Sequence, residues 1–272
     1  MRYGWARSFF LVLLGLGATL AGCKGDSGDP NSSSVTLYGV TANNVLVSFP
    51  STDPGDVTGH AITGLLTGEH GLDIDFRPAT GDLYLLTDSS RVYTLALTGE
   101  ATLVGGFTPL LKGTGFGFDV NPATDRIRIV TDSQSNFRIF PATGSLVATD
   151  PYLAWTAGDV HQGDFPAIIA IAHNHNTAST STSTLYYIDG EVSALARSTT
   201  PDDGVLHTVG SLGITVSGDG GFDVARNGTA YAALVIQGET NPRLYRVNLS
   251  SGAVREIGPI AAGRLLGLSA EP

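Results

Sequence analysis

The chain contains a repeat of about 45 residues, and this repeat constrains the fold more than any other feature. Gly71-Leu-Asp-Ile-Asp-Phe-Arg-Pro-Ala-Thr is followed 44 residues later by Gly115-Phe-Gly-Phe-Asp-Val-Asn-Pro-Ala-Thr. Gly221-Phe-Asp-Val is a shorter copy, and Ile168-Ile-Ala-Ile-Ala-His has a similar apolar run without the Asp. Each repeat has room for several short alternating strands, which is typical of the blades of a β-propeller. A β-sandwich is the alternative, although a sandwich does not require a four-strand period.

Each repeat divides into four short strands, the first of which would line the centre of a propeller. In the second repeat these strands are residues 72–76, 82–87, 92–97 and 102–107. The first repeat, from Thr36, has only three strands, and the chain ends in a lone strand at 265–270. Because an open ring would expose strand edges, we expect the C-terminal strand to complete the first blade. The prediction is an all-β propeller of five four-stranded blades, or six if residues 150–165 hide further strands.

The N-terminus has the organisation of a secretory signal peptide. Arg2 and Arg7 precede an apolar run over residues 9–20, which is too short to span a bilayer comfortably. The following Leu-Ala-Gly-Cys is similar to the lipobox of bacterial lipoproteins, so we expect a signal peptide at 1–22 and a lipid on Cys23. An ordinary signal peptide with an incidental cysteine is the alternative. Residues 23–34 would then be a lipidated, flexible tether, and residues 35–272 the propeller domain.

The residues around the cysteine and the net charge of the domain predict where the protein is located and which partners it can have. The signal peptide predicts export across the inner membrane. By resemblance to Gram-negative lipoproteins, Lys24 in place of an Asp after the cysteine indicates sorting to the outer membrane. Without the two signal arginines, 13 basic residues face 25 acidic ones, a net charge near −12. Such a surface repels nucleic acid, which is therefore excluded as a partner. Cys23 is the only cysteine, so if it carries the lipid, disulfides and thiolate catalysis are excluded as well.

Aligned acidic residues lie on the predicted inner strands. Asp75, Asp119 and Asp223 share one position of the repeat, His173 lies near it in the fourth repeat, and Ser269 in the closing strand. Carboxylates that converge with an imidazole could hold a divalent cation such as Ca²⁺ or Zn²⁺. Alternatively, each Asp accepts hydrogen bonds from the backbone of the next blade, as a repeated structural device.

Two further patterns concern the fourth repeat. His173 and His175 are two residues apart, so on a strand both rings would share one face, a recurrent arrangement for metal binding. His161 or Asp164 could complete such a site, while surface or capping roles are the alternative. Residues 176–183 form a Ser- and Thr-rich loop that we expect to be exposed, at the edge of a binding face.

The third repeat is the most polar. Its candidate ligand-binding residues are Asp119, Asn121, Arg126, Arg128, Asn136 and Arg138. Strand alternation places Arg126 and Arg128 on one face, and blades pack on both faces, so we expect buried guanidinium groups with carboxylate partners. Asp119, Asp125 and Asp132 are close enough in sequence to supply them. The cluster is either an ion-pair network between blades or a site for an anionic or hydroxyl-rich ligand.

Several stretches resemble the domain-of-unknown-function family 4394 of secreted bacterial proteins. They are Gly117-Phe-Asp-Val-Asn-Pro-Ala-Thr-Asp-Arg and the residues up to Arg138, Thr184-Leu-Tyr-Tyr-Ile-Asp, Pro201-Asp-Asp-Gly-Val-Leu-His-Thr-Val-Gly and Gly221-Phe-Asp-Val. The resemblance covers roughly residues 36–270 and implies a propeller-like fold, with no function assigned. Ala172-His-Asn-His-Asn replaces a string similar to Ala-Tyr-Thr-Asn-Asn, which removes a Tyr and adds two imidazoles.

Three functions follow from these patterns. The first is a lipid-anchored binding module of the cell envelope whose partner is an envelope glycan or protein. The second is a metal-dependent hydrolase or lactonase-like enzyme, with Asp75, Asp119, Asp223 and His173 as ligands and a bound water as nucleophile. The third is a purely structural lipoprotein. No Gly-x-Ser-x-Gly elbow is present, which removes one class of hydrolase.

Overall fold

The computed structural model describes Met1, Gly4 and residues 33–272. All strands of the described residues belong to the unit Ser34–Pro272. The predicted signal peptide, Cys23 and most of the tether lie outside the described residues. In the part of the chain that the structure describes, no helix is long and apolar enough to cross a membrane.

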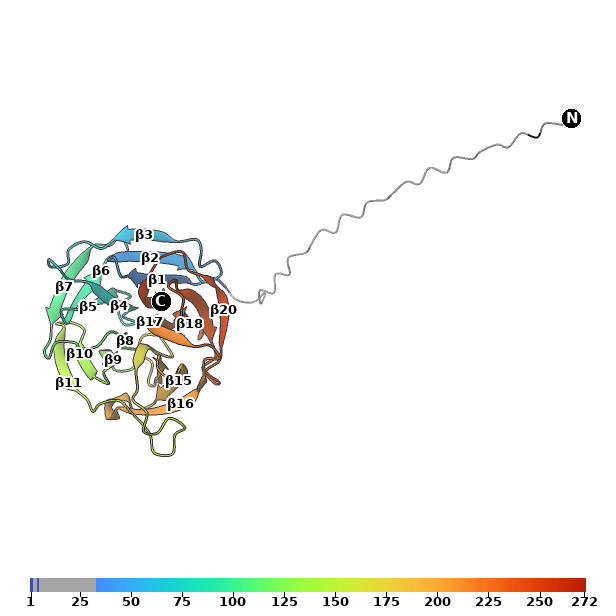
Figure 1. Cartoon of the computed structure of the whole chain (residues 1–272). Coiled ribbons are helices and arrows are strands. Elements are labelled where there is room, and N and C mark those ends of the chain that lie inside the picture. The colour runs from blue at the N-terminus through green and yellow to red at the C-terminus, as the bar shows by residue number, and fades with distance from the viewer. Residues whose placement is uncertain (2–3, 5–32) are drawn as a thin grey trace. The chain divides into compact units, whose positions relative to one another are not determined.

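The described residues form a five-bladed β-propeller (Figure 1). Blade 1 contains β1 (Thr36–Thr41), β2 (Val45–Pro50), β3 (Thr58–Ala61) and β21 (Leu265–Ala270). Blade 2 contains β4 (Gly71–Phe76), β5 (Leu83–Thr87), β6 (Arg91–Leu95) and β7 (Ala101–Gly106). Blade 3 contains β8 (Phe116–Asn121), β9 (Arg126–Thr131), β10 (Asn136–Phe140) and β11 (Ser145–Thr149).

Blades 4 and 5 complete the ring. Blade 4 contains β13 (Ile168–His173), β14 (Leu185–Asp189), β15 (Ala194–Ser198) and β16 (Val205–Ser211), with a short 3-10 helix, η1, at Pro201–Asp203. Blade 5 contains β17 (Val216–Val224), β18 (Ala230–Ile236), β19 (Arg243–Val247) and β20 (Val254–Pro259). The inner strands β21, β4, β8, β13 and β17 follow one another around the axis.

The chain ends close the ring as the sequence predicts. β21 pairs antiparallel with β1, and Ala270 lies opposite Leu37. The C-terminal strand therefore supplies the inner strand of blade 1, while the N-terminal part of the domain supplies the other three. This pairing joins the two ends of the domain and leaves no open blade.

Residues 150–165 do not form a sixth blade. They contain one two-residue strand, β12 (Ala154–Trp155), which pairs in parallel with the outer strand β16. Leu153 and Trp155 are buried in the hydrophobic cluster beside blade 4. The segment thus widens blade 4 by one strand, and the five-blade prediction is confirmed.

The hydrophobic core lies between the blades, because each sheet is covered on both faces. Central strands such as β5, β14 and β18 are almost entirely buried, whereas the outer strand β11 alternates between exposed and half-buried residues. Each of the five interfaces between neighbouring blades has its own cluster of apolar side chains. This arrangement explains why the strands read as near-continuous apolar runs rather than as strict alternation.

Glycines allow the inner strands to approach each other closely. A Cβ added to Gly221 of β17 would lie 2.3 Å from the backbone nitrogen of Leu268 on β21. A Cβ added to Gly267 would lie 2.1 Å from Oδ1 of Asp73 on β4. Both glycines precede the shared polar position of the repeat by two residues, so the backbones pack directly against the next blade at that level.

A buried glutamate fixes the loop between blades 1 and 2. Glu69 accepts hydrogen bonds from the Tyr93 hydroxyl, from Nη1 of Arg91 at 2.5 Å and from the Leu66 backbone nitrogen at 3.2 Å. Burial opposes ionisation, but the hydrogen bonds from Tyr93 and Arg91 outweigh it and lower the pKa of the Glu69 carboxyl. The ionised carboxylate therefore ties this loop to strand β6.

Candidate functional site

Three carboxylates from the inner strands of blades 2, 3 and 5 converge inside the ring. Asp75 of β4, Asp119 of β8 and Asp223 of β17 place one oxygen atom each within 4.8 Å of one another. Their exposed fractions are 1–2%. The alignment of these residues in the sequence thus correctly predicted that they come together. We call these three residues the axial cluster.

The same side chains also join neighbouring blades by hydrogen bonds. Each accepts a backbone N–H from the next inner strand, as the structural alternative in the sequence proposed. The pairs are Asp75 with Val120 at 2.8 Å, Asp119 with His173 at 3.1 Å and Asp223 with Ala270 at 2.7 Å. In blade 1, Oγ of Ser269 takes the corresponding role and accepts the Phe76 N–H at 3.2 Å. This repeated contact fixes the inner strands relative to one another.

Two polar side chains of blade 4 reach the axial cluster and retain atoms without partners. Nδ1 of His173 contacts Oδ1 of Asp119, while its Nε2 has no hydrogen-bond partner among the described residues. Nδ2 of Asn176 lies 3.5 Å from Oδ1 of Asp223, and its Oδ1 also lacks a partner in the described chain. Both side chains are buried. The sequence did not single out Asn176, which matches the last Asn of the family string and appeared only as the first residue of the Ser- and Thr-rich loop.

Burial and like charge make the axial cluster resist full ionisation. Burial, and then the charges of Asp119 and Asp223, raise the pKa of Asp75 well above its usual range. Burial and the charge of Asp119 raise the pKa of Asp223 to about 7. Without a counter-charge, the cluster therefore retains a proton near neutral pH.

The expected pairing of His173 with His175 is wrong. β13 ends at His173, and His175 has a left-handed backbone with φ of 55° and an exposed side chain. Strand alternation therefore stops before it can place the second ring on the first ring's face. His161 does not join His173 either, because its ring lies beside Asp164, with Nδ1 3.2 Å from Oδ2, and against Trp155.

The arginines of blade 3 form an ion-pair network with blade 4, but with partners other than those predicted. Arg128 is 3% exposed and donates to Oδ1 of Asn136 at 2.7 Å, to Oδ2 of Asp150 at 2.6 Å and to Asp202. Arg138 binds both oxygens of Asp150, at 2.9 and 2.8 Å, and pairs with Asp202 at 2.7 Å. Both guanidinium groups are thus paired with carboxylates of the same network.

The predicted carboxylate partners have other roles. Asp125 forms a two-pronged pair with Arg77 of blade 2, and Asp132 accepts backbone N–H groups of Thr114 and Gly115. Arg126 donates to the Asp125 backbone carbonyl at 2.7 Å, and its guanidinium carbon lies 4.6 Å from the centre of the Phe140 ring. Arg126 and Arg128 are therefore separated in function, although they lie on the same face of β9.

Asn121 and His175 meet in a polar groove between blades 3 and 4. The groove has a volume of about 380 Å³ and is lined by Asn121, Ala123, Thr124, His175, Ser181, Thr182, Ser183, Thr184 and Thr199. Eight of these nine residues are polar, and none carries a carboxylate, an ammonium or a guanidinium group. Oδ1 of Asn121 accepts the Ala123 N–H at 2.9 Å and the Ser183 hydroxyl at 3.3 Å, so one side chain joins both walls. We call this the hydroxyl groove.

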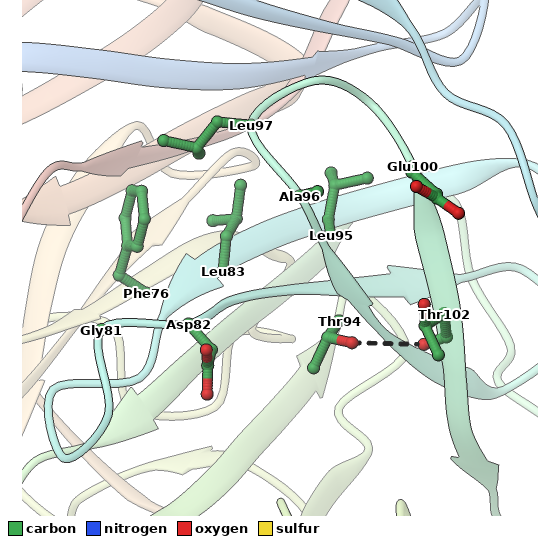
Figure 2. Close-up of a pocket in the computed structure, with 10 residues that line it drawn as sticks. All are labelled: Phe76, Gly81, Asp82, Leu83, Thr94, Leu95, Ala96, Leu97, Glu100 and Thr102. Carbon is green, nitrogen blue, oxygen red and sulfur yellow. Dashed lines mark hydrogen bonds between the residues drawn. The ribbon is translucent and has the colours of Figure 1, made fainter.

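Two other hollows contain none of the residues predicted from sequence. A cavity of about 360 Å³ on blade 2 has an apolar floor of Phe76, Leu83, Leu95 and Leu97, with Asp82 and Glu100 at its sides (Figure 2). A smaller one of about 150 Å³ lies near the first residues of the inner strands, and the Arg264–Asp219 ion pair forms part of its wall.

Comparison with solved structures shows what the fold is similar to but does not assign an activity. A protein of unknown function from Bacteroides thetaiotaomicron VPI-5482 aligns with a TM-score of 0.53 and 16% identity, over 87% of this chain and 64% of that protein. The chain thus spans less than two thirds of that protein's length, and at this identity the likeness shows the fold alone. A protein of unknown function from Bacteroides caccae aligns with a TM-score of 0.43 and 10% identity, over 88% of this chain and 99% of that one. Myxococcus xanthus glutaminyl cyclase gives a TM-score of 0.44 and 12% identity, over 84% and 97%.

At the level of sequence, no curated protein matches the chain. A family model, in contrast, matches residues 45–269, which cover nearly the whole propeller from β2 to β21. This is the family that the motifs in the third, fourth and fifth repeats resemble. The chain belongs to the family described as Domain of unknown function (DUF4394).

Proposed function

We propose that the protein is a lipid-anchored binding module of the cell envelope that takes a neutral, hydroxyl-rich ligand, such as a glycan, in the hydroxyl groove. The observation that carries this proposal is the composition of the groove wall. Hydroxyl, amide and imidazole groups both donate and accept hydrogen bonds, which suits the many hydroxyls of a sugar chain. Because the arginines of blade 3 are already paired with Asp150 and Asp202, an anionic ligand has less support.

The build of the groove supports a preformed site. Its walls come from the loop after β8 and the Ser- and Thr-rich loop between β13 and β14, which belong to neighbouring blades. The Asn121 side chain forms hydrogen bonds to both loops. Within the second loop, the backbone N–H of Thr184 donates to Oδ1 of Asn174 at 2.7 Å. A site whose walls are already held in place loses less conformational entropy when a ligand binds.

Membrane attachment is the second part of the proposal. The lipobox-like sequence before Cys23 supports a lipid anchor, and Lys24 supports the outer membrane of a Gram-negative cell as its location. A Cys23→Ser variant tests this point directly. We expect the wild type to incorporate labelled fatty acid and to sediment with the outer membrane, and the variant to do neither. Label on the variant would contradict Cys23 as the anchor.

Binding assays with purified envelope polysaccharides test the groove. The informative variant is Thr182→Val with Thr199→Val, which removes two hydroxyls from the wall at nearly constant volume. Thr98→Val, at an exposed turn of blade 2, is the matched control. Since a hydrogen bond contributes about 0.5–1.5 kcal/mol, we expect the double variant to bind roughly tenfold more weakly and the control to bind normally. Equal binding by the wild type, the double variant and the control would exclude the groove as the binding site. Binding of an envelope protein instead of a polysaccharide would contradict the assignment of the ligand as a glycan.

The hydrolase or lactonase-like alternative has less support. Its metal would lie in the axial cluster, where three carboxylates do converge. A hydrolase, however, must bring substrate to the metal-bound water. The three carboxylates are only 1–2% exposed, and their oxygens already accept backbone hydrogen bonds. These features favour a role in holding the ring together over a role in catalysis.

A further inference from the structure

We propose that the axial cluster binds one divalent cation, with Ca²⁺ as the preferred ion, which ties together the inner strands of blades 2, 3 and 5. This site is separate from the hydroxyl groove and goes beyond the binding function proposed for it. The geometry fits a single ion. Ca²⁺ binds oxygen at about 2.3–2.6 Å, so two ligands of one ion lie at most about 5 Å apart. The three carboxylate oxygens lie within 4.8 Å of one another.

Asn176 provides a second observation that is independent of the carboxylates. Its side chain is 93% buried, its amide reaches Asp223, and its carbonyl oxygen has no partner among the described residues. A buried amide oxygen without a donor is costly. The oxygen and nitrogen of an Asn side chain are interchangeable in shape, so a turn of the amide presents the oxygen to the axial cluster. A cation between the oxygens of Asn176 and Asp223 would satisfy both.

Charge balance supports the same conclusion. Among the described residues, the axial cluster has one ion pair, between Asp119 and His173, and no Lys or Arg pairs with it. In Asp75 and Asp119 each carboxylate oxygen accepts one hydrogen bond and keeps a further lone pair. In Asp223, Oδ1 keeps one beside the Val224 N–H once the Asn176 amide has turned, so a cation does not require the interblade hydrogen bonds to break. The donor set of three carboxylates and an amide oxygen favours a hard ion such as Ca²⁺. Zn²⁺ would instead favour the free Nε2 of His173.

The test compares calcium binding and thermal unfolding of the full chain in detergent, after treatment with EDTA. Asp75→Asn is the main variant, because its remaining oxygen can accept the Val120 N–H and the Ser269 hydroxyl can accept from the new amide. Asp219→Asn is the control, since Asp219 lies on β17 with Asp223 but pairs with Arg264 outside the axial cluster. Asn176→Ala tests the amide oxygen.

We expect one Ca²⁺ to bind per wild-type chain and to raise the melting temperature by roughly 5–10 °C when calcium exceeds its Kd about a hundredfold. The control should behave in the same way. Asp75→Asn and Asn176→Ala should bind at least about tenfold more weakly, and Asp75→Asn in EDTA should melt close to the wild type in EDTA. Absence of stoichiometric calcium, or an equal calcium response in Asp75→Asn, would overturn the proposal. Tighter binding of Zn²⁺ than of Ca²⁺, lost in His173→Gln, would overturn the assignment of the ion.

Discussion

Replacement of Arg128 tests the interface between blades 3 and 4. Arg128→Met keeps the length of the side chain and removes its charge and its donors. The side chain of Arg128 is 3% exposed and contacts Asn136, Asp150 and Asp202. Removal of one partner from a buried ion pair typically costs about 3–5 kcal/mol, because the remaining charge stays desolvated.

The surroundings place the expected cost at the lower end of that range. Asp150 keeps its two bonds to Arg138, at 2.9 and 2.8 Å, and the side chain of Asp202 is 50% exposed and can be hydrated. The buried Oδ1 of Asn136 loses its charged donor. We therefore expect Arg128→Met to lower the free energy of unfolding by about 3 kcal/mol.

Arg138→Met is the matched control within the same network. Its side chain is 29% exposed, and Asp150 would keep Arg128 as a buried partner, so we expect a loss of about 1 kcal/mol or less. Urea unfolding followed by circular dichroism measures both losses, at low and at high salt. The cost of Arg128→Met should change little with salt, because a buried pair is screened less than an exposed one. Equal losses in both variants, or a loss below about 1 kcal/mol in Arg128→Met, would refute the idea that burial gives the Arg128 ion pairs their contribution to stability.

Two further predictions concern the packing of the ring and its pH dependence. Gly267→Ala should destabilise the fold by about 1–3 kcal/mol in urea unfolding, because the new Cβ would lie 2.1 Å from Oδ1 of Asp73. Gly218→Ala is the control and should have little effect, because no atom lies within 4 Å of its added Cβ. The lowered pKa of Glu69 means that its ionised form stabilises the fold at pH values above its unfolded pKa of about 4.3, and that this contribution disappears as pH falls through the lower folded pKa. Unfolding curves of wild type and Glu69→Gln should therefore differ most at neutral pH and converge only as the pH falls through the lowered folded pKa of Glu69; a constant difference would contradict the carboxylate's role.

The fold could be predicted from the sequence because each blade of a propeller has a similar pattern of strands and turns. Similar Gly- and Asp-containing strands recur about once per repeat, and the incomplete first and last repeats leave one economical way to close the ring. Local patterns also placed Asp75, Asp119 and Asp223 together, because equivalent positions of a repeat lie at equivalent heights along the axis. The symmetry of the repeat alone therefore predicts that these carboxylates converge, without any knowledge of side-chain contacts.

The contacts between blades could not be predicted in the same way. Partners for Arg128 were sought nearby in sequence, yet Asp150 and Asp202 lie 22 and 74 residues away. Asp202 is placed by η1, a short element in a loop that follows no repeat. His175 failed for a related reason: strand alternation holds only while the strand continues, and a left-handed residue two positions after His173 ends it. Each error arose where the chain departs from the repeat.

These departures gather at one interface, and this bears on where the function lies. Of the described residues of blade 3, only Val130 contributes to the hydrophobic cluster shared with blade 4, because Arg126 and Arg128 occupy the rest of that face of β9. The cluster between blades 2 and 3, in contrast, receives several apolar side chains from each blade. A polar interface of this kind gives up hydrophobic burial, and proteins retain such local departures mainly where a site requires them. The hydroxyl groove lies between the loops of the same two blades, and His173 brings an imidazole from this interface to the axial cluster. The hydroxyl groove is therefore built at this interface, whereas the axial cluster combines Asp119 and His173 from it with Asp75 of blade 2 and Asp223 of blade 5.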